Sequence, residues 1–504
     1  MDRRHFLAAA GSTGLLGLNA CGGGGGSSAP APAPAPAAAP DWTALQGSIQ
    51  GTVMLPTTTG FIPAVQVFNA AYGAIPQALV RCASASDVAQ SLSFAKANKL
   101  ALTARSGGHS YIGNSTSTGL VIDVGDMDTI TVGSGTATIG AGAKLVDVYD
   151  QLSSQGVCIP SGSCPTIGIA GITQGGGIGV VDRAYGLTCD NLVSAQVVLA
   201  DGSIVICDAN THADLFWALR GGGGGNFGIV TSLTFNTFVT SDLTNFSADF
   251  AWTDAAAVIA AWQAWPQVLP DTVWSGLVMA TSATGSPSLE VSGTFIGSSA
   301  DFAPIWTAFL AATGATPTAQ SVQTQSFRDT MLSGCGSLTV SECHLPSETS
   351  DGEVTRAAFV ATSDFFNAPL PSAGIQALIA AVNAQQGIAG IVVIMDLMGG
   401  AINRVATDAT AFVHRNAVFS AQYYLEGPVG TDATLVAEAR SIATGMRTAM
   451  STWSSGECYQ NYLDPNLANW QAAYYGANYA RLVTVKAAYD PTGVFAQTQG
   501  IPTS

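Results

Sequence analysis

Three glycine-rich stretches constrain the fold of this chain more than any other feature of its sequence. The longest, SGSCPTIGIAGITQGGGIGVV, spans residues 161–181, and two shorter ones, RSGGHSYIGNS and RGGGGGNFG, span 105–115 and 220–228. Glycine is required where the backbone adopts positive φ or where no side chain fits. The three stretches therefore predict loops that hold something large and rigid against bare backbone.

The residues around these loops, from 76 to 235, alternate between strand-like and helical patterns. Ser86-Asp87 offers a helix N-cap, and the helix that follows gives way to a strand at Lys99–Thr103. A second helix begins near Leu145 and is closed by Gly156. The runs LVIDV, TITV and TATIGA have the composition of strands. We expect an α+β domain over residues 41–240.

Residues 241–450 contain longer runs, such as EVSGTFIGS, IVVIMDLMGG and FSAQYYLEG. They predict a second domain, an antiparallel sheet with helices on one face. The C-terminal segment, 451–504, is rich in aromatic residues and returns to the first domain. It contains a predicted helix from Trp470 to Tyr489 that stops at Asp490-Pro491.

The charge of the chain limits its partners. Only 10% of the 504 residues are charged, and the net charge at pH 7 is −16. Proteins that bind phosphate backbones need basic surfaces, so nucleic acid is excluded as a partner. Hydrophobic residues make up 47% of the chain, enough for a large core in two or three domains.

The N-terminus, MDRRHFLAAAGSTGLLGLNAC, resembles a twin-arginine export signal over residues 1–21, because Arg3-Arg4 precedes an apolar stretch. Its last residues resemble a lipobox and predict a lipid anchor through Cys21, with ordinary cleavage nearby as the alternative. Residues 22–40 form a Gly/Ser and Ala-Pro linker. We expect a periplasmic or membrane-anchored bacterial lipoprotein that takes up its cofactor before export.

Nine cysteines are spread thinly along the chain and do not form the dense framework of a small stapled domain. Cys335 and Cys343 are the nearest pair, and the sequence leaves open whether they are bridged. Neither CxxC nor HExxH occurs, so no zinc site is predicted.

Two common nucleotide-binding motifs are excluded. Gly223, Gly225 and Gly228 have the spacing GxGxxG, but that motif needs a strand before it and a helix after it. Here the helical run DLFWALR precedes and the strand-like run IVTSLTF follows. The motif GxxxxGK[ST], which binds the phosphates of ATP, does not occur, so the sequence does not predict ATP hydrolysis.

The loop Arg105–Ser110 presents successive backbone N–H groups, which suits a diphosphate. Together with SGSCPTIGIAGITQGGGIG, RAYGLTCDNL, DLFWALRGGGGGNFGIV, YQNYLDP and YDPTGVF, it resembles the berberine bridge enzyme-like oxidases. These belong to the PCMH-type FAD-binding superfamily that includes vanillyl-alcohol oxidase. The resemblance covers Leu79–Phe235 and Tyr459–Pro502. It implies a two-part FAD-binding domain and a separate substrate domain.

The resemblance also implies that FAD is bound covalently, through His109 at the 8α-methyl group and through Cys164 at C6 of the flavin. Imidazole and thiolate are nucleophiles able to attack an electron-poor ring. The other cofactor-binding residues that it implies lie in the glycine-rich stretches, in strand 229–235 or in YQNYLDP: Arg105, Ser106, Gly107, Gly108, Ser110, Thr166, Ile167, Gly168, Gly171, Thr173, Gly176, Gly177, Gly179, Ile229 and Asn461.

For catalysis, the resemblance implies that Tyr462 takes the substrate proton while a hydride passes to flavin N5. The ordinary pKa of tyrosine is near 10, so donors or cations must stabilise the phenolate. Tyr111 and Gln422 match further active-site positions, and strand alternation places Tyr424 on the same face as Gln422. For these three residues, packing or strand pairing is the alternative.

Two positions bear on the substrate and the electron acceptor. Ile172 stands where several sugar-oxidising members carry histidine, and Ile167 matches a position where oxygen meets the reduced flavin. We expect an exported FAD-dependent oxidoreductase that oxidises an alcohol or a sugar hemiacetal and uses oxygen or another acceptor. The alternative is a non-catalytic, flavin-bearing surface lipoprotein that binds a ligand or relays electrons.

Overall fold

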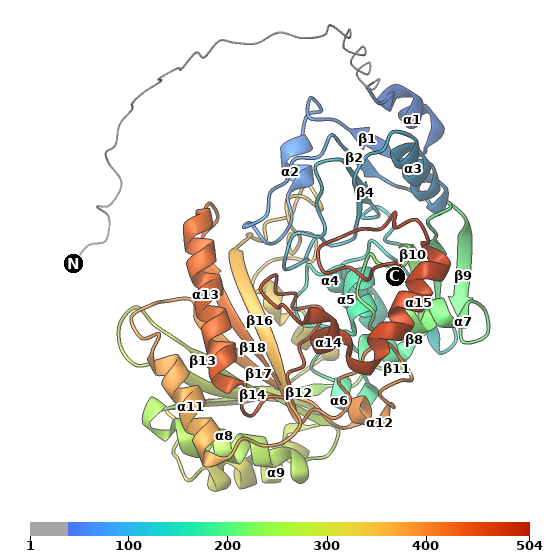
Figure 1. The fold of residues 1–504 in the computed structure, drawn as a ribbon. Coiled ribbons are helices and arrows are strands. Elements are labelled where there is room, and N and C mark those ends of the chain that lie inside the picture. Colours follow the sequence, from blue (N-terminus) through green and yellow to red (C-terminus); the bar gives the residue numbers. More distant parts are fainter. Residues whose placement is uncertain (1–38) are drawn as a thin grey trace, which may run out of the picture. The chain divides into compact units, whose positions relative to one another are not determined.

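Two sheets that share one hydrophobic core form the first half of the folded chain (Figure 1). The computed structural model describes residues 39–504, so the predicted signal and nearly all of the predicted linker lie outside the described residues. The first sheet has the order β1-β2-β4-β3, in which β4 is parallel to β2 and β3. Its strands are β1 (Thr52–Met54), β2 (Ala78–Arg81), β3 (Leu102–Arg105) and β4 (Leu120–Asp123).

The second sheet is antiparallel and has five strands, in the order β5-β6-β10-β8-β9. Val80 and Leu92, from the first sheet and its helix, lie in the same buried cluster as Ile139 and Leu233 of the second. The strands are β5 (Ile130–Val132), β6 (Thr136–Gly140), β8 (Leu192–Val198), β9 (Ile204–Asp208) and β10 (Ile229–Asn236). A short pair, β7 (Val157–Cys158) and β11 (Phe238–Val239), accompanies them.

The helices of this half are short and lie between the strands or next to them. The glycine-rich stretch 161–181 holds α5 and leads into α6. The helices of this half are α1 (Trp42–Ser48), α2 (Phe61–Val65), α3 (Ala85–Ala97), α4 (Leu145–Ser154), α5 (Ile169–Gly175), α6 (Asp182–Tyr185) and α7 (Ala213–Ala218).

The second half contains a seven-stranded antiparallel sheet in the order β15-β12-β14-β13-β17-β18-β16. Its first strand begins at Leu243, just after the predicted domain boundary at 240/241. The strands are β12 (Leu243–Phe250), β13 (Val273–Ala280), β14 (Ser288–Ile296), β15 (Ala319–Gln325), β16 (Ala358–Phe366), β17 (Ile391–Leu397) and β18 (Phe419–Gly427).

Because side chains alternate along each strand, the two faces of this sheet carry different residues. Met395 and Tyr423 belong to the core between the sheet and its helices, so Asp396 and Gln422 lie on the opposite face, away from these helices, which is called the open face below. The covering helices all lie on one side of the sheet (Figure 1): α8 (Ala255–Ala264), α9 (Ser299–Thr313), α11 (Ser372–Asn383) and α13 (Ala433–Met450). The predicted α+β fold, with helices on one face of an antiparallel sheet, is confirmed.

Two elements begin at residues other than those predicted. α3 begins after Ser84 rather than Ser86, because the Ser84 hydroxyl accepts a hydrogen bond from the Asp87 amide. β3 begins at Leu102, three residues later than predicted, because Lys99 has a φ of +53° and still belongs to the turn that ends the helix.

The predicted helix Trp470–Tyr489 is divided into α14 (Trp470–Tyr475) and α15 (Tyr479–Tyr489). Gly476, with a φ of +48°, breaks it. The C-terminal segment packs on the glycine-rich stretch 220–228, since the buried Lys486 Nζ donates to the carbonyl oxygens of Asn226 and Phe495 and pairs with Asp490. The second half also contains two short helices, α10 (Phe327–Met331) and α12 (Ala401–Arg404).

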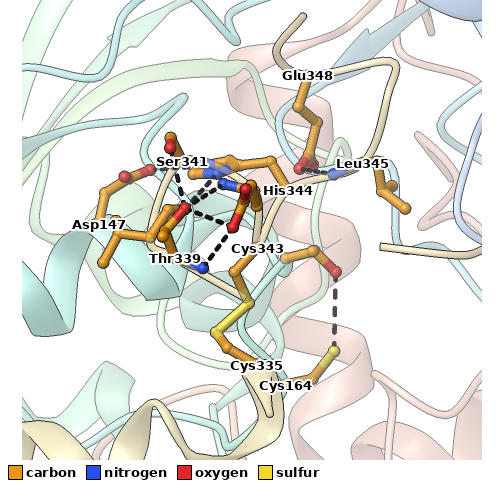
Figure 2. The surroundings of a disulfide bond; sticks show 12 residues. Asp147, Cys164, Cys335, Thr339, Ser341, Cys343, His344, Leu345 and Glu348 are labelled. Atoms are coloured by element: carbon orange, nitrogen blue, oxygen red, sulfur yellow. Dashed lines mark hydrogen bonds and ion pairs between the residues drawn. A yellow bond between two sulfur atoms is a disulfide. The ribbon is translucent and has the colours of Figure 1, made fainter. Parts of the chain in front are cut away.

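A disulfide joins Cys335 to Cys343, so the structure bridges the pair that the sequence left open. Figure 2 shows this bridge near Cys164. A Cβ atom on Gly334 would lie 3.4 Å from the Cδ atom of Pro165, so the loop that holds the disulfide packs on the loop that holds Cys164. Across residues 39–504, every helix is too short or too polar to cross a membrane.

Candidate active site

A cavity of about 320 Å³ lies where the three glycine-rich stretches meet. Its walls come from residues 102–111, from parts of 162–178 and from parts of 223–230. The C-terminal segment closes it with residues 459–463 and with parts of 495–499. Segments that are far apart in the sequence therefore build one site.

Two of the glycine loops cross in direct contact, which explains the glycines next to His109. A Cβ atom on Gly107 would lie 2.2 Å from the Gly168 amide nitrogen, and a Cβ atom on Gly168 would lie 2.0 Å from the Ser106 hydroxyl. Gly108 has a φ of +68°, a conformation that side chains disfavour. The crossing fixes the loop of His109 against the loop of Cys164.

His109 and Cys164 contact the same hydroxyl group. The Nε2 atom of His109 lies 2.7 Å from Thr166 Oγ1, and the Cys164 sulfur lies 3.9 Å from that oxygen. Burial, together with the nearby Lys144 ammonium, lowers the pKa of His109 to about 3. Burial raises the pKa of the Cys164 thiol. At neutral pH the imidazole is therefore uncharged, as a nucleophile must be.

Of the four predicted catalytic residues, Tyr111 and Tyr462 border the cavity, and Gln422 lies behind them in contact with Tyr111. The Tyr462 ring stacks on Tyr111, with centroids 5.2 Å apart, and the Gln422 side-chain amide donates to the Tyr111 hydroxyl at 2.9 Å. Tyr424 does not border the cavity; its hydroxyl donates to Glu426 and its ring lies 5.2 Å from that of Phe359.

The surroundings of Tyr462 do not stabilise a phenolate by themselves. Burial first, then Tyr111 and Asp396, raise the pKa of Tyr462 well above its ordinary value, and no cation is among the groups that act on it in the described part of the chain. Burial also raises the pKa of Asp396, to about 7. Asp396 lies on the open face of β17, paired with Gly276 and Ser420.

Asp396, which does not border the cavity but acts on the two tyrosines that do, is a residue that the sequence reasoning missed. Its charge acts on both Tyr111 and Tyr462. Register pairs Ile394 with Gln422, so Asp396 lies two residues along β17 on the same open face. The available signal was a single carboxylate in the otherwise apolar run IVVIMDLM.

Most of the predicted cofactor-binding residues border the cavity. The Arg105 guanidinium pairs with Asp123 and donates to the carbonyl of Ala64, so this side chain anchors its loop. The Asn461 amide donates to the Tyr459 hydroxyl at 2.8 Å. Those that border the cavity are Arg105, Ser106, Gly107, Gly108, His109, Ser110, Cys164, Ile167, Gly168, Gly171, Ile229 and Asn461.

Five of the predicted cofactor-binding residues do not border the cavity: Thr166, Thr173, Gly176, Gly177 and Gly179. Thr166 is fully buried behind His109, and the Thr173 hydroxyl donates to Ile169 within α5. The three glycines make room for protein atoms instead: Cβ atoms there would lie 2.7 Å or less from Phe412, Thr188 and Ser161.

The residues around the cavity fit FAD. Among the described residues, the backbone amides of 107–110 donate no hydrogen bond to protein, and such free N–H groups suit a diphosphate. The Oε1 atom of Gln174 is buried at the cavity wall without a partner among these residues. Gly171 faces open space, where a flat ring can approach the backbone.

Comparisons with known proteins agree with this geometry. Residues 76–208 match the family described as FAD binding domain, and residues 458–502 match the family described as berberine and berberine like. The uncharacterised FAD-linked oxidoreductase YgaK of Bacillus subtilis (strain 168) is 34% identical over 441 residues, which are 85% of this chain and 91% of YgaK.

Solved structures show the same fold. BBE-like 1 of Physcomitrella patens is 29% identical and superposes with a TM-score of 0.83, covering 92% of this chain and 99% of that one. Glucooligosaccharide oxidase of Acremonium strictum, described as carrying 6-S-cysteinyl, 8α-N1-histidyl FAD, is 25% identical with a TM-score of 0.82 and covers 92% and 99%.

Fold, cavity and comparisons together define an FAD-linked oxidoreductase of the PCMH-type superfamily. Within that superfamily, the chain belongs to the berberine bridge enzyme-like family. The family includes oligosaccharide oxidases with covalently attached flavin.

Proposed function

We propose that this enzyme oxidises a CH–OH group of a carbohydrate or another alcohol, with FAD joined covalently to His109 and Cys164. The observation that carries the proposal is that both nucleophiles border one cavity and meet at Thr166, while Tyr111 and Tyr462 border the same cavity. FAD, when bound, supplies a two-electron acceptor that receives the hydride at N5.

The residues on the tyrosine end of the cavity receive the proton that the substrate hydroxyl loses. Tyr462 is neutral in the protein alone, because burial raises its pKa. Asp396, with a pKa of about 7, is a carboxylate in much of the population at neutral pH and acts electrostatically on Tyr462. Because this charge opposes ionisation of Tyr462, we assign neutral Tyr462 as the group that contacts the substrate hydroxyl and Asp396 as the carboxylate that accepts the proton.

The open face of the sheet supports a polyhydroxylated substrate. Asp396, Ser420 and Gln422 bring polar side chains to this face on two adjacent strands. Gln422 already donates to Tyr111, and hydroxyl groups of a sugar can pair with the carboxylate of Asp396 and the hydroxyl of Ser420, which an apolar alcohol cannot do. A carbohydrate is thus the favoured donor, and dioxygen or another acceptor, which would meet the cofactor near Ile167, receives the electrons.

A panel of mono- and oligosaccharides and simple alcohols, assayed with dioxygen and with a dye as acceptor, tests this proposal. The expected result is turnover of at least one carbohydrate, lost in Tyr462→Phe while the yellow colour of the protein stays. Absence of turnover with every donor and both acceptors would overturn the assignment and favour a flavoprotein that only binds ligand or relays electrons.

We further propose that the enzyme is exported by the twin-arginine route and anchored through a lipid on Cys21. The disulfide between Cys335 and Cys343 supports an oxidising compartment. Labelling of bacteria with a radioactive fatty acid is expected to mark the wild-type protein and not a Cys21→Ala variant. Equal labelling of both, or of neither, would contradict the anchor.

A further inference from the structure

Thr166 makes contacts that a simple cofactor-binding role does not explain. Its side chain is fully buried and does not border the cavity. Its hydroxyl lies 2.7 Å from His109 Nε2 and 3.9 Å from the Cys164 sulfur, and within residues 39–504 it has no other hydrogen-bond partner. Figure 2 shows the Cys164 sulfur, with a dashed line from it to an oxygen atom. One hydroxyl therefore touches both residues that the proposed function links to FAD.

A threonine hydroxyl carries one proton, so it can donate to only one of these neighbours. If it donates to His109 Nε2, the imidazole proton sits on Nδ1 and that nitrogen has no free lone pair. If Nε2–H donates to Thr166, Nδ1 keeps its lone pair and the threonine proton is free to point at the Cys164 sulfur. A donor on sulfur favours the thiolate, the reactive form of cysteine.

We propose that Thr166 holds the second arrangement and so prepares His109 and Cys164 together for attachment to FAD. Thr166 is in this sense a positioning residue, and the inference rests on the proposed covalent linkages.

Two neighbours of His109 favour this arrangement, one by orienting the ring and the other by keeping it uncharged. Phe68 stacks on the imidazole with centroids 4.0 Å apart and an angle of 16° between the planes. Tilting the ring would break this stack, and turning it over by 180° would break the bond to Thr166. Lys144, a buried cation, disfavours a second proton on the imidazole. No described residue hydrogen-bonds to Nδ1, so a single imidazole proton finds a protein partner only on Nε2, in Thr166.

The attachment steps balance when FAD takes up the electrons and an external acceptor reoxidises it. Each consumes one C–H bond of the flavin and one N–H or S–H bond of the protein, forms one C–N or C–S bond, and releases two protons and two electrons. For His109 the proton lost is the one on Nε2, and Thr166 is its first acceptor. The electrons reduce the flavin itself, and dioxygen or another external two-electron acceptor then reoxidises it.

The test compares Thr166→Val, which removes the hydroxyl and nearly keeps the shape, with Thr166→Ser, which keeps the hydroxyl. Full-length apoprotein from riboflavin-limited cells is mixed with FAD, samples are precipitated with acid at intervals, and the flavin retained in the pellet is measured. His109→Ala and Cys164→Ala backgrounds report the two bonds separately. Peptide masses identify each bond.

We expect Thr166→Val to slow both attachments about tenfold, the effect of roughly one hydrogen bond, and Thr166→Ser to stay within about twofold of wild type. If Thr166→Val does not fold, Thr166→Ala replaces it and must show the same loss. Slowing at only one of the two residues, or wild-type rates at both, would overturn the shared role of Thr166. Release of flavin from the acid-treated wild type would instead overturn the covalent linkages of the proposed function.

Discussion

The loop side of the site, residues 105–111 and 161–179, can be compared with its sheet side, the open face of β17 and β18. On the loop side, Gly107 and Gly168 leave out side chains where two backbones touch. On the sheet side, Asp396 and Gln422 supply the polar groups, and the backbone is an ordinary antiparallel ladder. The cofactor half thus depends on backbone shape, whereas the substrate half depends on side-chain chemistry.

The largest effect is expected from adding one methyl group on the loop side. In Gly107→Ala the new Cβ would lie 2.2 Å from the Gly168 nitrogen, so the backbones must separate. We expect a loss of about 3 kcal/mol of stability or more, together with loss of flavin, measured by thermal unfolding and by absorbance of the purified protein.

Gly171→Ala is the matched control, because a Cβ atom there meets no protein atom within 4 Å and faces the cavity. The apoprotein should fold normally and bind FAD more weakly. If Gly107→Ala were as stable as Gly171→Ala, the close contact of the two loops would not be the reason that position 107 requires glycine.

On the sheet side, substitutions should change turnover and leave the cofactor in place. Tyr462→Phe should lower kcat about a thousandfold and Asp396→Asn about a hundredfold, within the range of lost proton transfer. The measurement is steady-state kinetics at equal flavin content. Loss of flavin in either variant would show that the sheet side also holds the cofactor. An undiminished kcat would show that the substituted residue takes no part in the reaction.

These differences also explain how much the sequence could predict. His109, Cys164 and the glycines around them lie in contiguous motifs whose backbone needs are visible in the residue types. Asp396 and Gln422 lie on separate strands, and only the sheet register brings them to one face, so Asp396 was missed, and Gln422 was predicted only from the family resemblance.

The roles of Gly176, Gly177 and Gly179 could not be read from the sequence for a different reason. Glycine indicates a close approach but does not say whether a ligand or a protein atom approaches. Here Phe412, Thr188 and Ser161 come from distant segments and take the space. The break at Gly476 is similar, since the helical periodicity of 470–489 continues through a residue that adopts positive φ.

The pH dependence sharpens the comparison further. Asp396 has a pKa raised to about 7, so it is protonated below that pH and can accept a proton only above it. Turnover should rise with pH through about 7, and Asp396→Asn should flatten this rise. A rise of unchanged shape in Asp396→Asn would assign the titration to another group.

The same shift predicts a stability effect of opposite sign. The folded state keeps the Asp396 proton up to about pH 7, whereas the unfolded chain loses it near its ordinary value of 3.8. Folded protein therefore loses stability from this group as pH rises from about 4 to 7. In Asp396→Asn the loss should be absent, seen as a melting temperature that depends less on pH than that of wild type.

The smallest effect should come from the disulfide, which touches the loop side from outside the cavity. Replacing Cys335 and Cys343 by serine should cost about 2 kcal/mol and leave kcat and the amount of bound flavin unchanged. Thermal unfolding with and without a reductant measures it. A large loss of flavin would show that the disulfide loop helps to hold the loop of Cys164.

The most direct measurement is mass spectrometry of the wild-type protein after acid denaturation and proteolysis. The account predicts one adduct in which a single FAD joins the peptide of His109 to the peptide of Cys164. Free flavin in the supernatant, with both peptides unmodified, would contradict it.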